Sequence, residues 1–310
     1  GINLTSSLSE IALMWMNNYH SPRSGVYVGE INTKDINEIL KYPSVSYISP
    51  VFERNTHNNQ ARIHMGINTV ENTYVTGLNG SGQIVAVADT GIDQDHGDFG
   101  DRIVGVVNVA GDSSTADTND GHGTHVACTV LGDGSRTSTY TGVAPESELY
   151  FQAMEIDSNA QLSNSGIYGM LNSAYNSGGA RFHTNSWGSA VGGSYTTQSE
   201  DADDRTSTWD QYWSYQGMTV LFAAGNEGDN GISSPGTAKN VITVGGHVNR
   251  YGSPDEMYTF SSRGPTDDGR IKPDVTGPGD YVRSCLAQEA EDASTNIGDS
   301  YYIEYSGTSM

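Results

Sequence analysis

The stretch QIVAVADTG, residues 83–91, indicates the fold of this chain more clearly than any other segment. It contains an apolar run without polar alternation, as expected for a strand of a parallel sheet that is covered on both faces. Asp89 stands at the carboxyl end of this strand, and Gly91 permits a tight turn after it. Because binding sites of open α/β sheets lie at the carboxyl ends of strands, Asp89 is a candidate functional residue.

The rest of the chain repeats this alternation of strand and helix. Further apolar strands are predicted over residues 148–154, 218–223 and 241–244, and helices over residues 124–130, 163–176 and roughly 200–215. The pattern predicts an α/β fold with a doubly wound, mainly parallel sheet flanked by helices. Residues 189–197 are rich in Gly, Ser and Thr and predict a surface loop.

The first part of the chain reads as a separate unit. Residues 25–31 and 44–51 predict strands, and residues 33–40 predict a short helix between them. Residues 54–59 are polar and aperiodic, which is typical of an exposed linker. We therefore expect a small α+β unit over residues 1–57 and one large domain over residues 58–310.

Composition excludes several classes of partner. The chain has 15 Lys and Arg against 37 Asp and Glu, a formal net charge of −22. Such a charge argues against nucleic acid or an anionic membrane surface as the partner. No apolar run reaches the roughly 18 residues that a membrane span needs. Two readings of the acidity stay open: an ordinary solvated surface, or adaptation to high salt.

Two cysteines, Cys128 and Cys285, are too few for a disulfide framework. We expect two small buried thiols, although a single bridge between them is a second possibility that sequence does not decide.

Four motifs bring together the residue types of nucleophilic catalysis. Asp89 is followed by His122 in GHGTHVA (residues 121–127), Asn226 in AAGNEG (residues 223–228) and Ser309 in SGTSM (residues 306–310). A serine is a weak nucleophile without an adjacent base, so His122 is expected within about 3 Å of Ser309 Oγ. Asp89 would orient the histidine, and the Asn226 amide would donate to an oxyanion.

In this order the motifs resemble those of the subtilisin-like serine proteases, the subtilases. The segments FSSRGP (residues 260–265) and KPDV (residues 272–275) add to the resemblance, which covers residues 58–310. The form of residues 184–188 and 260–265 is most similar to the oxidatively stable alkaline protease branch. The resemblance implies a secreted serine endopeptidase of broad specificity that forms an acyl-enzyme through Asp89, His122 and Ser309, with Asn226 as the oxyanion donor.

The resemblance also implies where substrate binds. Ser186, Trp187 and Gly188 match the family segment that pairs with the extended substrate backbone, and Asn159, Ala160 and Gln161 lie near the expected partner strand. The small residues Ala223, Ala224 and Gly225 suggest a roomy pocket, suited to a large apolar side chain before the cleaved bond.

Other expectations concern the ends of the chain and metals. By resemblance, residues 1–57 are the C-terminal part of an inhibitory propeptide, a partner of the enzyme besides protein and peptide substrates. The family continues after its nucleophile into a helix, so a chain ending at Met310 is expected to be a fragment that is itself inactive. Catalysis needs no cofactor. Structural calcium is implied, but the acidic segment of residues 93–98 does not match an EF-hand loop and no ligands are identified.

Three alternatives remain beside this interpretation. His122 and His125 lie three residues apart and have the spacing of a zinc pair, but the motif lacks the expected Glu and a third ligand. Within the protease class, a narrow processing enzyme would use residues 189–210 for selectivity. From another class, the chain would be a non-catalytic binding protein on the same fold.

Overall fold

The computed structural model describes residues 38, 40–41, 57–71, 77–156, 160–163, 166–209, 214–249, 255–290 and 299–310. The chain divides into two compact units, Gly1–Asn55 and Thr56–Met310. The strands predicted over residues 25–31 and 44–51 lie outside the described residues, as does the helix predicted over residues 33–40 apart from positions 38 and 40. The assignment of residues 1–57 to a propeptide therefore stays a prediction.

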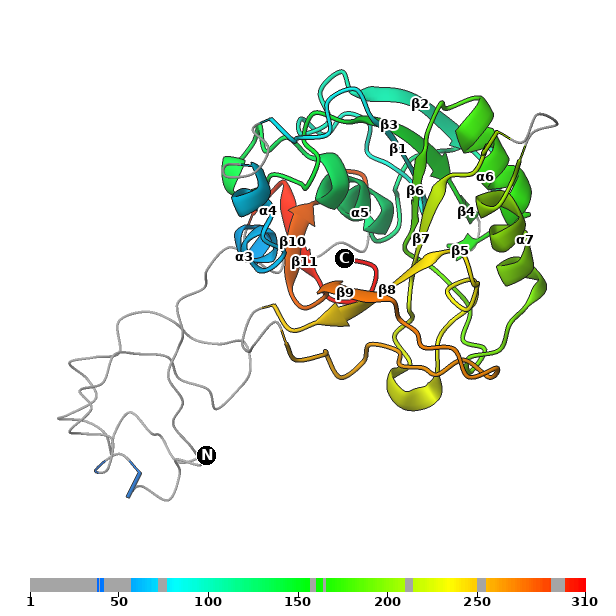
Figure 1. Cartoon of the computed structure of the whole chain (residues 1–310). Helices are drawn as coiled ribbons and strands as arrows, with labels where there is room; N and C mark the ends of the chain where they lie inside the picture. Colours follow the sequence, from blue (N-terminus) through cyan, green and yellow to red (C-terminus); the bar gives the residue numbers. More distant parts are fainter. Residues whose placement is uncertain are drawn as a thin grey trace. The chain divides into compact units, whose positions relative to one another are not determined.

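The larger unit is built on a parallel sheet of seven strands (Figure 1). Their order is β2-β3-β1-β6-β7-β8-β9, and every neighbouring pair is parallel. The strands are β1 (Ile84–Asp89), β2 (Ile103–Asn108), β3 (Glu148–Ala153), β6 (Phe182–Asn185), β7 (Thr219–Ala223), β8 (Ile242–His247) and β9 (Val275–Pro278). The predicted doubly wound sheet is confirmed, and the four strands expected from sequence correspond to β1, β3, β7 and β8.

Helices cover both faces of this sheet (Figure 1). The side chains of β1 alternate between two cores: Ala86 and Ala88 belong to one apolar cluster, and Val87 belongs to the other. The first cluster contains residues of α6 and α7, and the second contains residues of α5. The three helices are α5 (His122–Leu131), α6 (Ile167–Asn176) and α7 (Thr197–Thr206). Because both faces are covered, β1 carries no polar alternation.

Two helix predictions differ from the structure in their bounds. The helix predicted over residues 163–176 begins at Ile167. The helix predicted near residues 200–215 begins at Thr197 and ends at Thr206, so the prediction is wrong for residues 207–209 and 214–215, and residues 210–213 lie outside the described part of the chain. Beyond the end of this helix, Trp209 and Tyr215 form an isolated bridge, with their ring centroids 5.5 Å apart.

The smaller elements complete the larger unit. They are α3 (His57–His64), α4 (Ile67–Thr69), the 3₁₀ turns η3 (Ser138–Tyr140) and η4 (Gly228–Asn230), the pair β4 (Glu155–Ile156) and β5 (Gln161–Leu162), and the antiparallel pair β10 (Val282–Cys285) and β11 (Tyr302–Tyr305). Among the described residues, no helix has the length and apolar character needed to cross a bilayer.

The strand order reverses its direction of growth between β1 and β6. From β1 the chain first builds the sheet toward β3 and β2, and later resumes at β6 on the opposite side. Such a switch point leaves a crevice outside the carboxyl ends of the two strands, where α/β proteins bind ligands. Ala88 and Asn185 are paired across these strands, so Asp89 and Ser186 emerge side by side at that edge.

Candidate active site

Strand β1 and helix α5 bring Asp89 and His122 into contact. Asp89 ends β1 and is only 1% exposed, and His122 is the first residue of α5. His122 Nδ1 donates a hydrogen bond to Asp89 Oδ1 at 2.6 Å, and Thr90 N donates to the same oxygen at 2.8 Å. With Nδ1 as the donor, Nε2 is the ring nitrogen that can accept a proton.

The surroundings of His122 act on its pKa in opposite directions. Burial lowers the pKa, whereas the charge and hydrogen bond of Asp89, and the charges of Asp120 and Asp117, raise it to about 9. The net effect favours the imidazolium, which is the state that a general base reaches after taking a proton.

Ser309 lies against the segment that follows β6. Its Oγ donates to the carbonyl oxygen of Ser186 at 2.9 Å, and Ser186 Oγ donates to the carbonyl oxygen of Ser309 at 2.8 Å. Within the described residues, no hydrogen bond joins Ser309 Oγ to His122, so the expected contact of about 3 Å is absent. A hydroxyl has one proton and rotates freely, and catalytic hydrogen bonds often tighten only when substrate binds.

Asn226 is held by the residue that precedes Ser309. Its Oδ1 accepts hydrogen bonds from Thr308 N at 3.0 Å and from Thr308 Oγ1 at 3.2 Å. Since the side-chain oxygen is engaged in this way, Nδ2 is the group of Asn226 that can donate to a substrate.

Ser309 and Asn226 line the same cavity, which has a volume of about 220 Å³. Its wall also contains most of the residues that the sequence assigned to substrate binding: Ser186, Trp187, Gly188, Ala223 and Gly225. The wall includes Ala190, Glu227, Ser233 and Thr308 as well, which the sequence reasoning had not assigned.

Three of the residues expected at the substrate site do not line this cavity. Ala224 is fully buried, and its backbone N–H bonds to the Val244 carbonyl oxygen at 2.9 Å. Ala160 and Gln161 are exposed at the short β4–β5 pair. Asn159 lies outside the described residues.

The missed residues differ in how visible they were. Glu227 directly follows Asn226 in the sequence, so the Asn226 motif could have indicated that Glu227 lies near the cavity. Ser233 had no local signal: it reaches the cavity because Gly225, at φ 104°, packs so closely that a Cβ there would lie 2.2 Å from Ser233 Oγ.

The structure does not support a zinc pair at His122 and His125. His125 is fully buried, and its Nε2 donates to the Val282 carbonyl oxygen at 3.0 Å. Burial lowers the pKa of His125 to about 3. It is therefore a neutral core residue, stacked on Tyr305 with ring centroids 4.8 Å apart.

The acidic segment of residues 93–98 does not fit a calcium site. Asp93 uses its carboxylate to accept from the backbone N–H groups of Asp95 and Gln288. Asp98 accepts from Arg136 N at 3.0 Å and from Tyr302 OH at 2.7 Å. Both carboxylates face protein donors, whereas a calcium ion needs six to eight converging oxygen ligands.

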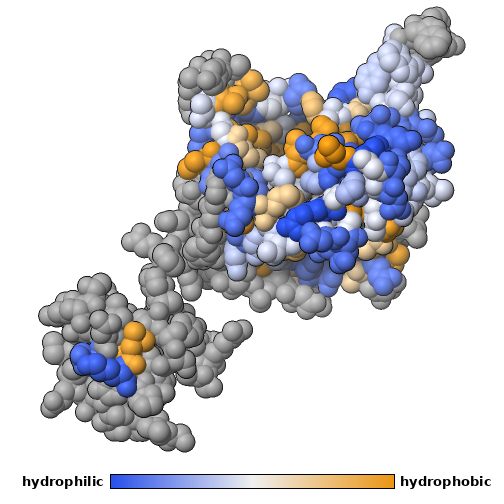
Figure 2. Space-filling view, turned by 60° about the horizontal axis from the view of Figure 1, so that its bottom comes forward, coloured by the Kyte–Doolittle hydropathy of each residue, from blue (hydrophilic) through white to orange (hydrophobic). Residues whose placement is uncertain are grey.

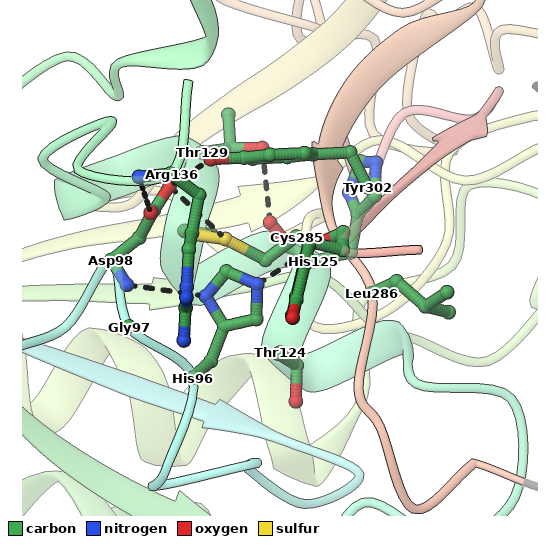
Figure 3. Close-up of a disulfide and its surroundings, with 12 residues drawn as sticks. His96, Gly97, Asp98, Thr124, His125, Thr129, Arg136, Cys285, Leu286 and Tyr302 are labelled. Atoms are coloured by element: carbon green, nitrogen blue, oxygen red, sulfur yellow. Dashed lines mark hydrogen bonds between the residues drawn. A yellow bond between two sulfur atoms is a disulfide. The ribbon is translucent and has the colours of Figure 1, made fainter. Parts of the chain in front are cut away.

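Cys128 and Cys285 form a disulfide, so the expectation of two free thiols is wrong (Figure 3). Their Cα atoms are 5.7 Å apart, within the normal range for a bridge. His96 and Asp98 lie beside the sulfurs, and one possible ligand atom from each of the four residues falls within 4.8 Å of the others. Because the sulfurs are bonded to each other, they offer no thiolate to a metal.

Comparison with known proteins agrees with this geometry. The family whose sequence pattern matches residues 80–310 is described as the Subtilase family. The chain belongs to the subtilase family. It is 33% identical over 247 residues to the serine protease AprX of Bacillus subtilis, covering 75% of this chain and 55% of that protein. It is 31% identical to Subtilisin-like protease 2 of Pseudogymnoascus destructans, covering 88% of this chain and 64% of that protein.

Solved structures share the fold. Sphericase is 26% identical at a TM-score of 0.56, covering 79% of this chain and 78% of that one. The CspB protease of Clostridium perfringens, at 16% identity, has a TM-score of 0.63 and covers 81% of this chain and 85% of that one.

An alkaline protease of Alkalihalobacillus alcalophilus is 33% identical, over 70% of this chain and 53% of the relative. The chain thus spans about half the length of several curated relatives, and its place in the oxidatively stable alkaline protease branch stays a prediction.

Proposed function

We propose that this chain carries the catalytic domain of a secreted serine endopeptidase with an Asp89–His122–Ser309 triad. The observation that carries the proposal is the 2.6 Å bond between Asp89 and His122 in a subtilase chain whose Ser309 and Asn226 line one cavity. Met310, next to Ser309, packs on the same apolar cluster as α5. The base and the nucleophile are therefore held by one core.

In this mechanism His122 Nε2 takes the Ser309 Oγ proton while Oγ bonds to the substrate carbonyl carbon. The carbonyl π electrons move to oxygen, and Asn226 Nδ2 donates to that oxyanion, a contribution worth about 100- to 1000-fold in rate. When the tetrahedral intermediate collapses, the C–N bond breaks and the proton on His122 passes to the departing amine. Water then repeats these steps and releases the acid from the acyl-enzyme. No cofactor enters the reaction.

The substrate is a protein or peptide chain in an extended conformation. The backbone of residues 186–188 would pair with it, which provides affinity with little sequence content. The cavity beside Ala223 and Gly225 has small residues on its wall and suits a large apolar side chain before the cleaved bond. We further propose that residues 1–57 belong to a propeptide that is removed by cleavage near residues 54–59, which N-terminal sequencing of the active enzyme will check.

A fluorophosphonate probe tests the catalytic assignment in the full-length protein. We expect covalent labelling at Ser309, and none in a Ser309→Ala variant. Ser306→Ala is the matched control, because Ser306 is exposed nearby and its Oγ accepts from the backbone N–H of Tyr281 at 2.8 Å. An unlabelled Ser309 in folded protein would favour a non-catalytic binding protein. Labelling together with cleavage of one sequence alone in a peptide library would favour a narrow processing protease.

A further inference from the structure

Asp117 is a buried carboxylate that the proposed chemistry does not use. It is fully buried, and both of its oxygens are engaged. Oδ1 accepts from Thr90 Oγ1 at 2.8 Å, and Oδ2 accepts from Thr124 N at 2.7 Å. A buried carboxylate is costly unless it is hydrogen-bonded, so these contacts hold Asp117 in one orientation.

These two contacts reach the two elements that hold the acid–base pair. Thr90 directly follows Asp89 and donates its N–H to Asp89 Oδ1. Thr124 is two residues beyond His122 in α5. The Thr90 hydroxyl also accepts from Gly123 N at 2.8 Å. A continuous chain of hydrogen bonds therefore runs from the turn after β1, through Asp117, to the first turn of α5.

The beginning of α5 explains why this chain of hydrogen bonds through Asp117 and Thr90, here called the clamp, is needed. The cap residue Gly121 has no side chain, so it satisfies none of the free N–H groups of the first turn. Three other side chains do so: Asp120 accepts from His122 N at 3.0 Å, Thr90 accepts from Gly123 N, and Asp117 accepts from Thr124 N. A carboxylate at this end of the helix is also favoured by the helix dipole.

Close backbone packing leaves the clamp little freedom. A Cβ on Gly91 would lie 2.2 Å from the Ala116 carbonyl oxygen, and one on Gly123 would lie 2.3 Å from the Gly91 carbonyl oxygen. The backbone before Asp117, the turn after Asp89 and the start of α5 are thus in direct contact.

From these contacts we infer that Asp117 is a positioning residue, which sets the distance and angle between Asp89 and His122 through Thr90 and the α5 N-terminus. This inference rests on the proposed protease function. Asp117 is not among the residues that line the Ser309 cavity, and the proposed proton transfers do not use it, so its loss should alter the catalytic step rather than substrate binding.

The test compares Asp117→Ala with the wild type in the full-length enzyme, using a peptide substrate. We expect kcat per folded molecule to fall about 10- to 100-fold, the scale of a misplacement near 1 Å, with KM unchanged. The downfield proton resonance of His122 Nδ1 should shift or broaden. Asp117→Asn should restore kcat to near the wild-type value, because its oxygen can still accept from Thr124 N and the Thr90 hydroxyl can accept from its amide.

Asp203→Ala is the matched control. Asp203 is also a buried carboxylate, and it accepts from the backbone N–H groups of Lys239 and Asn240 on the other face of the sheet. It should lower the thermal midpoint without changing kcat per folded molecule. If Asp117→Ala behaves in the same way, the positioning role is wrong.

Should Asp117→Ala fail to fold, Thr90→Val provides a second test. Valine keeps the shape but removes the bridging hydroxyl. It should lower kcat while leaving KM unchanged, because the link between Asp117 Oδ1 and Gly123 N is lost. Thr90→Ser, which keeps the hydroxyl, should restore kcat to near the wild-type value, and a wild-type kcat for Thr90→Val would overturn the inference. Failure of the proposed function is distinguishable, since the wild type would then show no labelling at Ser309.

Discussion

The pKa of His122 affects both the activity and the stability of the enzyme. Since the pKa of the folded enzyme's His122 is raised to about 9, mainly through Asp89 acting against burial, the neutral base becomes more populated as pH rises toward that value. We expect kcat/KM to increase from neutral pH and level off above about pH 9. The same shift stabilises the folded state below pH 6.5, and that contribution is lost as pH rises through 9.

Removing the charge of one exposed carboxylate, Asp120, tests whether His122 controls the pH profile of kcat/KM. Asp120→Asn keeps an oxygen for the His122 N–H but removes a charge that raises the His122 pKa. The acid limb of the kcat/KM profile should move to lower pH by less than about one unit, since charges about 4 Å apart in water interact by about 1 kcal/mol. An acid limb that stays in place would show that another group controls it.

Ser309 and His122 should act as one unit. Ser309→Ala or His122→Ala should each remove nearly all hydrolysis, and the double variant should cost little more than either single one. Rates of peptide hydrolysis for the three variants, measured in the full-length protein, test this. Losses that add in free energy would place the two residues in different sites.

At the scale of elements, the disulfide joins α5, which carries His122, to β10. It closes a loop with a sequence separation of 157, and bridges over long loops typically stabilise by about 2–4 kcal/mol. We expect reduction, or replacement of both Cys128 and Cys285 by Ser, to lower the thermal midpoint clearly. At temperatures well below that midpoint kcat should be unchanged, because α5 stays packed in its apolar cluster.

Scanning calorimetry with and without a reductant measures this effect. The double Cys→Ser variant is its own control, since a reductant should leave its midpoint unchanged. Equal midpoints for the oxidised and reduced wild type would mean that the core alone holds α5 to β10.

At the scale of the whole molecule, the net charge of −22 implies repulsion among the acidic side chains. On the face of the larger unit shown in Figure 2, the coloured residues are largely hydrophilic, with small apolar patches. Salt shortens the screening length from about 10 Å at 0.1 M to about 3 Å at 1 M, which relieves repulsion among carboxylates. We expect the thermal midpoint to rise between low and molar sodium chloride. A thermal midpoint that does not change with salt would indicate that the acidic side chains are simply solvated and that their repulsion does not destabilise the fold.

Much of the sheet and its carboxyl-end motifs followed from local pattern. The apolar run before Asp89 predicted β1, and the pattern of residues 124–130 predicted α5, which begins two residues earlier, at His122. Helix α7 was predicted to run too far, because the bridge between Trp209 and Tyr215 that follows it depends on a contact between residues separated in the chain. Ala224 was assigned to the pocket because its side chain is small, whereas the residue is fully buried and its backbone N–H bonds to the Val244 carbonyl oxygen.

By itself, the sequence determined the α/β class, the family and the chain order of Asp89, His122, Asn226 and Ser309, because these depend on neighbours and spacing along the chain. Tertiary structure alone decided which distant groups meet. It paired Cys128 with Cys285, turned Ser309 Oγ toward Ser186, and placed Asp117 between Thr90 and Thr124. Such contacts depend on packing at the scale of a few ångströms between segments far apart in sequence, and no local pattern carries that information.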